Sequence, residues 1–481
     1  MSANEKAIEA VIGLEVHCQL STDSKIFATS STAAGEVPNS LTDPVTLGLP
    51  GCLPVLNKKV VEYAIKLGLA THCSIQRESI FARKHYLYPD LPKGYQISQY
   101  EKPICLGGNI TVRLKEGIKN IGITRIHLEE DAGKSSHVDG EAVSVVDLNR
   151  AGVPLVEIVS EPDMRTSEEA GAYMRLLRQT VRYLDISDGN MEEGSLRCDA
   201  NVSVRYEGSE KFGTKVEVKN INSFRFVEKA IDYEIERQSA MLRNGEEIIQ
   251  ETRLWDEAKG KTRSMRSKEF AEDYRYFPDP DLLPLIVDND WIDSVKNTLP
   301  ELPDQVYQRF KSMYGLDDYN ADVLTQESLV ARYYDQAVSV HGNAGALANW
   351  IGTELFGRLN KEGMTIENCP VSPENLADLV HLIGQNVISG KIAKKVFDEM
   401  FSSGARPAAI IEQQGLQQIT DESAIMAIVQ QVLDANPQQL EAYRSGKDKM
   451  FGFFVGQIMK LSEGKANPQI VNTLLKQKLD E

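Results

Sequence analysis

Hydrophobic and polar residues alternate in many short segments of the first 290 or so positions. The alternation is clearest in VIGLEVHCQL, LRCDANVSVRY and KVEVKN, where nearly every second residue is apolar. Because successive side chains of a strand point to opposite faces of a sheet, each segment predicts a strand with one apolar and one strongly polar face. Gly and Pro residues punctuate these segments, as expected for strands joined by turns.

Two helices are expected within this strand-rich part. Thr166 and Glu169 form a capping-box pattern at the start of a periodic run that ends near Asp185. A second apolar stripe with helical spacing runs from about residue 224 to residue 242, and Asn244-Gly245 is a typical end for it.

The pattern changes after Trp291, where strand signals almost vanish and helical runs separated by short loops follow. A break at SSGARP sets off the last 75 or so residues, which are again helical. We therefore predict an α+β chain in three parts: a body with a mixed or antiparallel sheet at 1–292, a helical domain at 293–405 and a small helical tail at 406–481.

Composition narrows the class of protein. Hydrophobic residues make up 42% and charged residues 26%, which excludes a fibrous or largely disordered chain, and no apolar run is long enough to span a bilayer. The net charge of −17 repels polyanions, so any contact with nucleic acid must be local. The six cysteines include no CxxC pair, and the first residues do not resemble a signal peptide; both features favour a reducing cytoplasm.

Several carboxylates lie in segments that are otherwise apolar. Glu15 and His17 share the polar face of one predicted strand, Glu157 stands between two apolar residues, and Asp199 lies on another polar face. The segment TRIHLEEDAGK adds His127, Glu129, Glu130 and Asp131 near a strand end. For any single strand, a solvated face is the simpler explanation. Crowded, half-buried carboxylates nevertheless repel one another unless a cation joins them.

Oxygen ligands with at most one imidazole suit Mg²⁺ or Mn²⁺ better than zinc, and Mg²⁺ at carboxylates commonly serves a phosphate-bearing substrate. The chain has neither a GxxxxGK[ST] loop nor a GxGxxG fingerprint, so an ATP site would be of another design. Lys134, Lys215 and Lys219 lie on or beside these segments and could balance phosphate charge. The pattern predicts a metal-assisted phosphoryl-transfer site; no Ser/His or Cys/His pair indicates a nucleophilic hydrolase.

The segments GLEVHCQL, RKHYLYPDLPKGYQISQY, HLEEDAGK, VDLNRAGVPLVEIVSEPDM, GSLRCDANVSVR, KVEVKNINSF and DYRYFPDPDLLP resemble, in order and over nearly the whole chain, the GatB family, the B subunits of bacterial glutamyl/aspartyl-tRNA amidotransferases. The resemblance implies a glutamine-synthetase-like cradle with the catalytic site at 1–292, a helical domain and a YqeY-like tail that binds tRNA. It also implies a complex with an amidase A subunit and a small C subunit, and no membrane.

The family's reaction implies ATP as a substrate and Mg²⁺ as a cofactor. ATP phosphorylates the side-chain carboxylate of Glu on tRNA-Gln or Asp on tRNA-Asn, and ammonia from the A subunit displaces the phosphate. The family's catalytic metal site, transferred to matching positions, implicates Glu15, His17, Glu129, Glu130, Glu157 and Asp199.

Substrate contacts are expected from basic and aromatic residues. The segment RKHYLYPDLPKGYQ suits the aminoacylated end of a tRNA, and a packed loop is the alternative. The expected phosphate and substrate contacts are Lys84, His85, Tyr86, Tyr88, Lys134, Arg150, Lys215 and Lys219. Lys391, Lys394 and Lys395 fall on one helical face and are expected to contact tRNA.

One segment departs from the family. Many members carry a four-cysteine zinc site before LGLPG, whereas this chain has Ala28, Ser30, Asp43 and Thr46 at the four positions. We therefore expect no zinc there.

Two other functions remain open from the sequence. The chain could be a non-catalytic tRNA-binding scaffold in which the acidic sheet only stabilises the assembly. It could also be a free-standing ATP-dependent ligase related to glutamine synthetase, which would not depend on tRNA.

Overall fold

The computed structural model describes residues 6–137, 143–267 and 274–480; Asp273, the first residue of DYRYFPDPDLLP, lies outside them. The chain forms two compact units, Met1–Leu302 and Pro303–Glu481. The expected α+β class with a mixed sheet is confirmed. The proposed boundaries at residues 292 and 405 stay predictions, and the unit boundary at Leu302 lies close to the first of them.

Ten strands of the described chain form one large sheet in the order β15-β14-β13-β12-β1-β11-β8-β6-β2, with β7 paired to β8. Only β13 and β14 are parallel. The strands are β1 (Ile8–Gln19), β2 (Ser74–Ile75), β6 (Cys105–Leu106), β7 (Asn109–Leu114), β8 (Gly117–Glu130), β11 (Pro154–Ser160), β12 (Leu196–Tyr206), β13 (Val216–Ile221), β14 (Glu251–Asp256) and β15 (Lys261–Ser267).

Shorter strands pair outside this sheet. A three-stranded sheet has the order β16-β4-β5, and two ribbons are formed by β10 with β9 and by β17 with β3. The bounds are β3 (Glu78–Ser79), β4 (Phe81–His85), β5 (Tyr95–Gln99), β9 (Lys134–His137), β10 (Ser144–Asp147), β16 (Phe277–Pro278) and β17 (Leu285–Ile286).

The helices of the first unit are α1 (Lys58–Ala70), α2 (Ser167–Tyr183), α3 (Phe224–Asn244) and α4 (Asn289–Lys296). Both helices expected from the sequence are confirmed. The Thr166 hydroxyl accepts the Glu169 N–H at 3.2 Å, and the Glu169 carboxylate in turn accepts the Arg165 N–H at 2.6 Å. Gly245 ends α3 in the left-handed conformation, with a φ of 73°.

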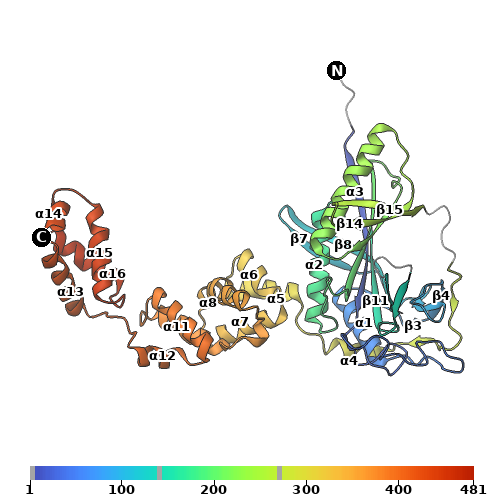
Figure 1. Ribbon diagram of the computed structural model, residues 1–481, viewed down its shortest axis with the longest axis horizontal. Coiled ribbons are helices and arrows are strands. Elements are labelled where there is room, and N and C mark those ends of the chain that lie inside the picture. Colours follow the sequence, from blue (N-terminus) through green and yellow to red (C-terminus); the bar gives the residue numbers. More distant parts are fainter. Residues whose placement is uncertain (1–5, 138–142, 268–273, 481) are drawn as a thin grey trace, which may run out of the picture. The chain divides into compact units, whose positions relative to one another are not determined.

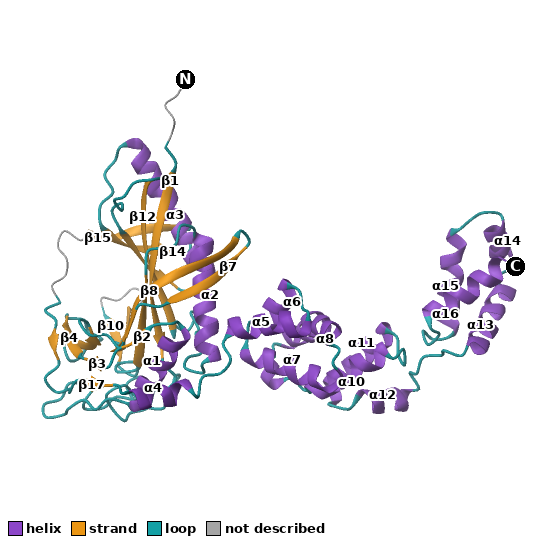
Figure 2. Cartoon of the chain, turned by 180° about the vertical axis from the view of Figure 1, so that it is seen from behind, coloured by secondary structure: helices purple, strands orange, loops and turns teal. Residues whose placement is uncertain are grey.

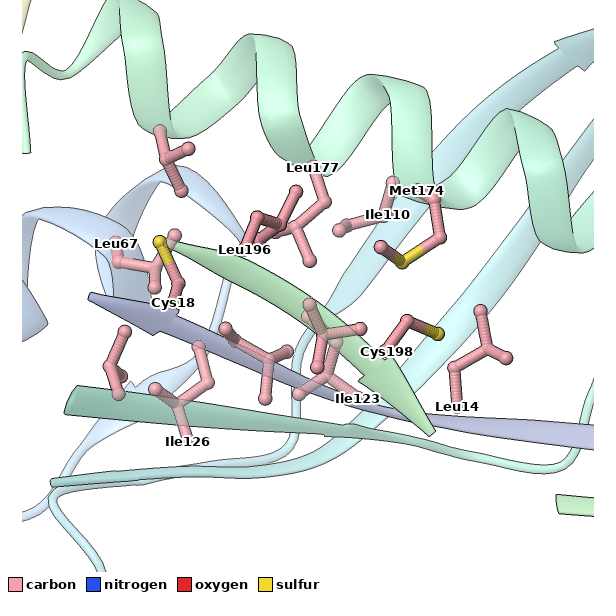
Figure 3. Close-up of a cluster of buried hydrophobic side chains, with 14 of the residues drawn as sticks. Leu14, Cys18, Leu67, Ile110, Ile123, Ile126, Met174, Leu177, Leu196 and Cys198 are labelled. Carbon is pink, nitrogen blue, oxygen red and sulfur yellow. The ribbon is translucent and has the colours of Figure 1, made fainter. Parts of the chain in front are cut away.

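The apolar face of the large sheet packs against α2 and α3, which run along it (Figures 1 and 2). Figure 3 shows Leu14 and Cys198 from the strands close to Met174 and Leu177 from α2, and all four are buried. A one-residue slip of a strand would bring this whole apolar set to the other face. Burial on this side therefore fixes which side chains form the polar face opposite.

The second unit is entirely helical within its described residues. Its helices are α5 (Pro303–Tyr314), α6 (Asp318–Thr325), α7 (Ser328–His341), α8 (Ala344–Trp350), α9 (Phe356–Glu362), α10 (Pro373–Gly384), α11 (Gly390–Ser403), α12 (Pro407–Gln414), α13 (Glu422–Ala435), α14 (Pro437–Arg444), α15 (Lys449–Leu461) and α16 (Pro468–Asp480), with a π-helical turn η1 (Ile351–Leu355) and a 3₁₀ turn η2 (Ile366–Asn368). α12 packs against α10 and α11, and a separate core follows, built around Val429, Phe454 and Leu475. No helix among the described residues combines the length and the hydropathy that a membrane span requires.

Candidate functional site

Four neighbouring strands bring the predicted carboxylates together. In the order β12-β1-β11-β8, Glu15 of β1 is paired with Asp199 of β12, and His17 of β1 is paired with Glu157 of β11. Glu157 is in turn paired with His127 of β8. Because paired residues of adjacent strands lie on the same face, these five side chains form a continuous row across the polar face of the sheet.

His17 and Glu157 of this row form a cluster with Glu129 of β8, and we call these three residues the acidic trio. Their ligand atoms all lie within 4.8 Å of one another. The Nε2 atom of His17 is 3.3 Å from the Glu157 carboxylate and 3.5 Å from the Glu129 carboxylate. Both glutamates are buried, whereas the His17 side chain is 22% exposed and so leaves the trio accessible. One imidazole and two carboxylates fit Mg²⁺ or Mn²⁺.

The electrostatics of the trio favour a bound cation. Burial raises the pKa of Glu129, and the charge of Glu157 raises it further. Burial opposes ionisation of Glu157 as well, but contacts with His127 and His17 hold its pKa well below the usual range. Burial alone would lower the pKa of His17, yet Glu157, Glu129 and Asp199 raise it to about 9. A proton on His17 thus supplies positive charge that a metal ion would otherwise bring.

Glu15 and Asp199 flank the trio on the same face. The Glu15 carboxylate accepts a hydrogen bond from the Asn201 side chain at 2.9 Å. Lys219 lies 2.7 Å from Asp199 and 3.2 Å from Glu217, and although burial opposes its charge, these two carboxylates raise its pKa. Lys219 therefore stays cationic beside the trio, where a phosphate would be attracted to it.

Glu130, the sixth predicted ligand, has different partners. Its carboxylate contacts the Lys93 ammonium at 2.6 Å and accepts the Ile97 N–H at 2.8 Å. These contacts favour a structural role in which Glu130 ties β5 to β8. Glu130 as a metal ligand stays a prediction.

A group of basic and polar side chains lies at the Gln19 end of β1. The Asp131 carboxylate accepts hydrogen bonds from Gln19 at 2.8 Å and from Arg197 at 2.9 Å. Arg150 is 3.7 Å from the same carboxylate and donates to the carbonyls of residues 132 and 133. The Arg197 Nε is buried, and none of the described residues accepts a hydrogen bond from it. Guanidinium groups at this end suit an anionic substrate group.

Aromatic side chains form a second group near the trio. The Tyr86 hydroxyl donates to Gln96 at 3.0 Å, and Lys84 lies 4.7 Å from the centre of the Tyr274 ring. Burial and then the charge of Glu129 raise the pKa values of Tyr86 and Tyr276. Gln96 also donates to the Glu130 carbonyl at 2.6 Å, so hydrogen bonds connect Tyr86 to the end of β8 that carries Glu129.

The remaining predicted contacts are more dispersed. His85 donates from Nδ1 to the Arg275 carbonyl at 3.2 Å and stacks on Phe277, while the Tyr88 ring is 56% exposed. Lys134 begins β9 and is exposed, and Lys215 borders a cavity beside Glu15. Their roles stay predictions.

The three lysines predicted to contact tRNA lie on α11 of the second unit. Lys391, Lys394 and Lys395 are all exposed. Lys394 also lies 2.7 Å from Glu354, so part of its charge is already balanced. Contact with tRNA stays a prediction for these residues.

From the sequence, His127 and Asp131 are expected among the crowded side chains of this region without a stated role, whereas Arg197 and Lys93 are not assigned to the site. His127 has the same strand parity as Glu129, and Arg197 the same parity as Asp199, so alternation alone places each pair on one face. Asp131 follows the end of β8, and Lys93 lies in a turn. Alternation does not predict the direction of a side chain at either place.

The segment that departs from the zinc pattern is held by hydrogen bonds. The Ser30 hydroxyl donates to Asp43 at 2.5 Å, and the Thr46 hydroxyl does so at 2.8 Å. Lys25 is fully buried, donates to the Leu41 carbonyl at 2.8 Å and lies 3.9 Å from Asp43.

We expect the purified protein to hold no stoichiometric zinc at this segment. Zinc in such loops is bound by thiolates, whereas the Asp43 carboxylate already accepts two hydroxyls and faces a buried ammonium. Elemental analysis of the dialysed protein by mass spectrometry measures this directly. One zinc per chain that survives dialysis would contradict the expectation.

Comparisons with known proteins match nearly the whole chain. A family model described as the GatB/GatE catalytic domain matches residues 10–293. A second one, described as the GatB domain, matches residues 332–479 and thus extends over both the predicted helical domain and the predicted tail.

Three curated relatives carry the name of the B subunit of aspartyl/glutamyl-tRNA(Asn/Gln) amidotransferase. The one from Syntrophotalea carbinolica is 60% identical over 98% of each chain. The one from Trichlorobacter lovleyi is 59% identical over 98% of this chain and 99% of its own. The one from Thermodesulfovibrio yellowstonii is 55% identical over 97% of this chain and 98% of its own.

Proposed function

The chain belongs to the GatB family, and on that premise we propose that it is the subunit in which ATP activates the side-chain carboxylate of a tRNA-bound amino acid for amidation. The substrates are Glu-tRNA(Gln) and Asp-tRNA(Asn), and the products are Gln-tRNA(Gln) and Asn-tRNA(Asn). The partners are an amidase A subunit, which supplies ammonia from glutamine, and a C subunit. The unpaired state of all six cysteines supports a reducing cytoplasm as its location.

The observation that carries this proposal is the convergence of His17, Glu129 and Glu157 within 4.8 Å on one face of the sheet. A carboxylate is a poor electrophile, so amidation requires a better leaving group than oxide, and phosphorylation provides it. The donor set of the trio fits Mg²⁺, with Glu15 and Asp199 beside it. When bound, the metal neutralises phosphate oxygens and favours in-line transfer.

The chain's own residues have separate roles in this reaction. Lys219 stays cationic beside Asp199 and attracts phosphate charge, and Arg197 and Arg150 offer guanidinium N–H groups at the Gln19 end. In this reaction the buried glutamates would serve as metal ligands and not as nucleophiles. Tyr86 and Lys84 line the approach that we assign to the aminoacylated end of the tRNA.

The test is amide formation by the complex of the A, B and C subunits with ammonium as the nitrogen donor. We expect amidation of Glu-tRNA(Gln) to require ATP, to stop on removal of divalent cations by EDTA, and to return on addition of Mg²⁺ or Mn²⁺. Glutamine hydrolysis by the A subunit is the internal control and is expected to continue in EDTA. Amidation that persists without divalent cations would contradict the proposal.

The same assay separates the two other functions. A scaffold subunit would show no ATP turnover that depends on the trio. A free-standing ligase would use ATP and ammonium equally well without tRNA.

A further inference from the structure

Two loops that are far apart in the sequence are joined by a reciprocal pair of asparagines. Asn39 donates from Nδ2 to the Val146 carbonyl at 3.0 Å, and its Oδ1 accepts the Leu148 N–H at 2.8 Å. In return, Asn149 donates from Nδ2 to the carbonyl of residue 37 at 2.8 Å, and its Oδ1 accepts the N–H of residue 41 at 2.8 Å. We call this pair of side chains the asparagine clasp.

Asp147 reinforces the clasp from within the second loop. Its Oδ1 accepts the backbone N–H of Asn39 and that of Asn149, both at 3.0 Å. The hydrogen bond from Asn149 lowers the pKa of Asp147 although burial opposes this effect. Asn39 has a φ of 62°, a left-handed conformation that asparagine adopts more readily than most other residues with a side chain. Hydrogen bonds to both main chains therefore fix the two loops to each other.

The second loop needs this support because the large sheet does not hold it. Among the described strands, β10 pairs with β9 alone, and this ribbon is separate from the large sheet. The first loop, by contrast, is anchored in the interior, since the fully buried Lys25 donates to the Leu41 carbonyl at 2.8 Å. The clasp thus transmits the fixed position of Leu41 to the turn that follows β10.

Arg150 is the residue directly after the clasp. Its Nε and Nη2 donate to the carbonyls of residues 132 and 133 at 2.9 Å and 2.6 Å. A guanidinium carries five N–H groups, and within the described chain these two carbonyls leave the others available for an anion. The Arg150 side chain is 34% exposed, so an anion can reach it.

Contacts connect Arg150 with the acidic trio. Arg150 lies 3.7 Å from the Asp131 carboxylate, which accepts a hydrogen bond from Arg197 at 2.9 Å. Arg197 of β12 is paired with His17 of β1. The place of the Arg150 guanidinium relative to the trio therefore depends on the turn that carries it, and this turn depends on the clasp.

We propose that Asn39 and Asn149 are positioning residues for the reaction, because the clasp holds the turn so that the Arg150 guanidinium faces a phosphate group of a substrate. This inference rests on the function proposed above, since that reaction brings phosphate to the trio. Phosphate comes from two sources, ATP and the tRNA backbone. Guanidinium groups bind phosphate through paired N–H donors, so their orientation matters as much as their charge.

Asn39→Gly, Arg150→Ala and the double variant test the proposal in the complex of three subunits. Glycine keeps the left-handed main chain at position 39 and removes both side-chain hydrogen bonds. We expect ammonium-dependent amidation to fall about tenfold in Asn39→Gly and about 100-fold in Arg150→Ala. Because the clasp acts through Arg150, the double variant is expected to stay within about twofold of Arg150→Ala.

A merely structural role of Asn39 predicts a different result. The two losses would then multiply to about 1,000-fold in the double variant, since independent effects add as free energies. That result, or an unchanged rate in Asn39→Gly, would overturn the proposal. If Asn39→Gly does not fold, Asn149→Ala takes its place, because it removes the reciprocal pair of hydrogen bonds and carries the same expectation.

Asn386→Gly is the matched control. Asn386 is exposed in the second unit and also has a positive φ, 56°. The control makes the same substitution in the same main-chain conformation, so its amidation rate is expected to stay within about twofold of the wild type. A tenfold loss in this control as well would remove the support that Asn39→Gly gives and overturn the proposal.

Binding measurements identify the phosphate and do not depend on amide formation. In calorimetry with Mg²⁺ present, we expect Asn39→Gly to weaken binding of inorganic triphosphate about tenfold, with no further loss in the Arg150→Ala background. The same pattern in the Kd for Glu-tRNA(Gln) instead would assign the phosphate to the tRNA, and the clasp would still be supported. Both constants unchanged in Asn39→Gly would overturn the role of the clasp.

The two proposals can fail separately. A wild-type complex that forms no amide, but whose phosphate binding depends on the clasp through Arg150, would overturn only the proposed function. A wild-type complex that forms amide, with independent effects of Asn39→Gly and Arg150→Ala, would overturn only the role of the clasp.

Discussion

Glu157→Gln is expected to reduce ammonium-dependent amidation by about 100- to 1,000-fold, since loss of a carboxylate from a metal site removes several kcal/mol of transition-state stabilisation. Glu157 is the most connected member of the trio, with His17 at 3.3 Å and His127 at 3.2 Å. Glutamine keeps the shape but removes the charge that draws a cation between these groups. A single-turnover assay of amide formation measures the effect, and calorimetric titration with Mg²⁺ is expected to show weaker binding.

Glu161→Gln is the matched control. Glu161 follows β11, is exposed, and accepts a hydrogen bond from Thr124 at 2.7 Å, outside the trio. The Glu161→Gln change removes the same charge but lies outside the trio, so the amidation rate of this variant is expected to remain within about twofold of the wild type. Equal rates for Glu157→Gln and Glu161→Gln would exclude Glu157 from the metal site.

The second large effect concerns stability. Glu234 of α3 is fully buried and is contacted by Arg237 at 2.7 Å, by Arg253 at 3.2 Å and by the Thr262 hydroxyl at 2.5 Å. Glu234→Ala leaves the Arg237 guanidinium without its counter-charge, while Arg253 keeps only its ion pair with Glu251 at 2.5 Å. We expect the first unit to lose about 3–5 kcal/mol of unfolding free energy, the usual cost of breaking such a buried pair. Glu236→Ala, an exposed neighbour on the same helix, is expected to have almost no effect.

The effect of Glu234→Ala is also expected to depend on pH. Burial opposes the charge of Glu234, but its hydrogen bonds to Arg237, Gln238 and Thr262 lower its pKa. A carboxylate with a lowered pKa stabilises the fold above its ordinary value of about 4.3, and this contribution is lost as the pH falls through the folded-state value. The difference between wild type and variant should therefore shrink in acid. Urea unfolding followed through the buried Trp255 would measure it, and a difference that grew in acid would contradict this account.

The strands, their polar faces and two helices could be predicted because each depends on local pattern. Alternation places Glu15 and His17 on one face, and the Thr166 cap and Gly245 mark the ends of helices. The order β12-β1-β11-β8 has no local signal, since 112 residues separate His17 from Glu129 and their proximity depends on packing of the whole sheet.

Strand alternation does not predict the contacts of every residue near the site. Glu130 is the last residue of β8, where a side chain no longer has to follow the strand, and it contacts Lys93, which lies in the turn before β5, instead of the trio. Within the described chain the Oδ1 atom of Asn201 is buried without a hydrogen-bond partner, which the sequence does not show because it depends on which side chains meet across β1 and β12.

The antiparallel register of β12, β1, β11 and β8 constrains how this protein can vary in length. Deleting Val16, the residue between Glu15 and His17, would move the side chains of half of β1 to the opposite face of the sheet. A charged side chain would then be buried against α2, and an apolar side chain would be exposed. Substitutions within these strands are therefore expected to be tolerated better than insertions or deletions of residues. Insertions and deletions should be tolerated at hairpin tips such as the one that joins β7 to β8. In an alignment of relatives, gaps are therefore expected at such tips and not within the strands that carry the trio.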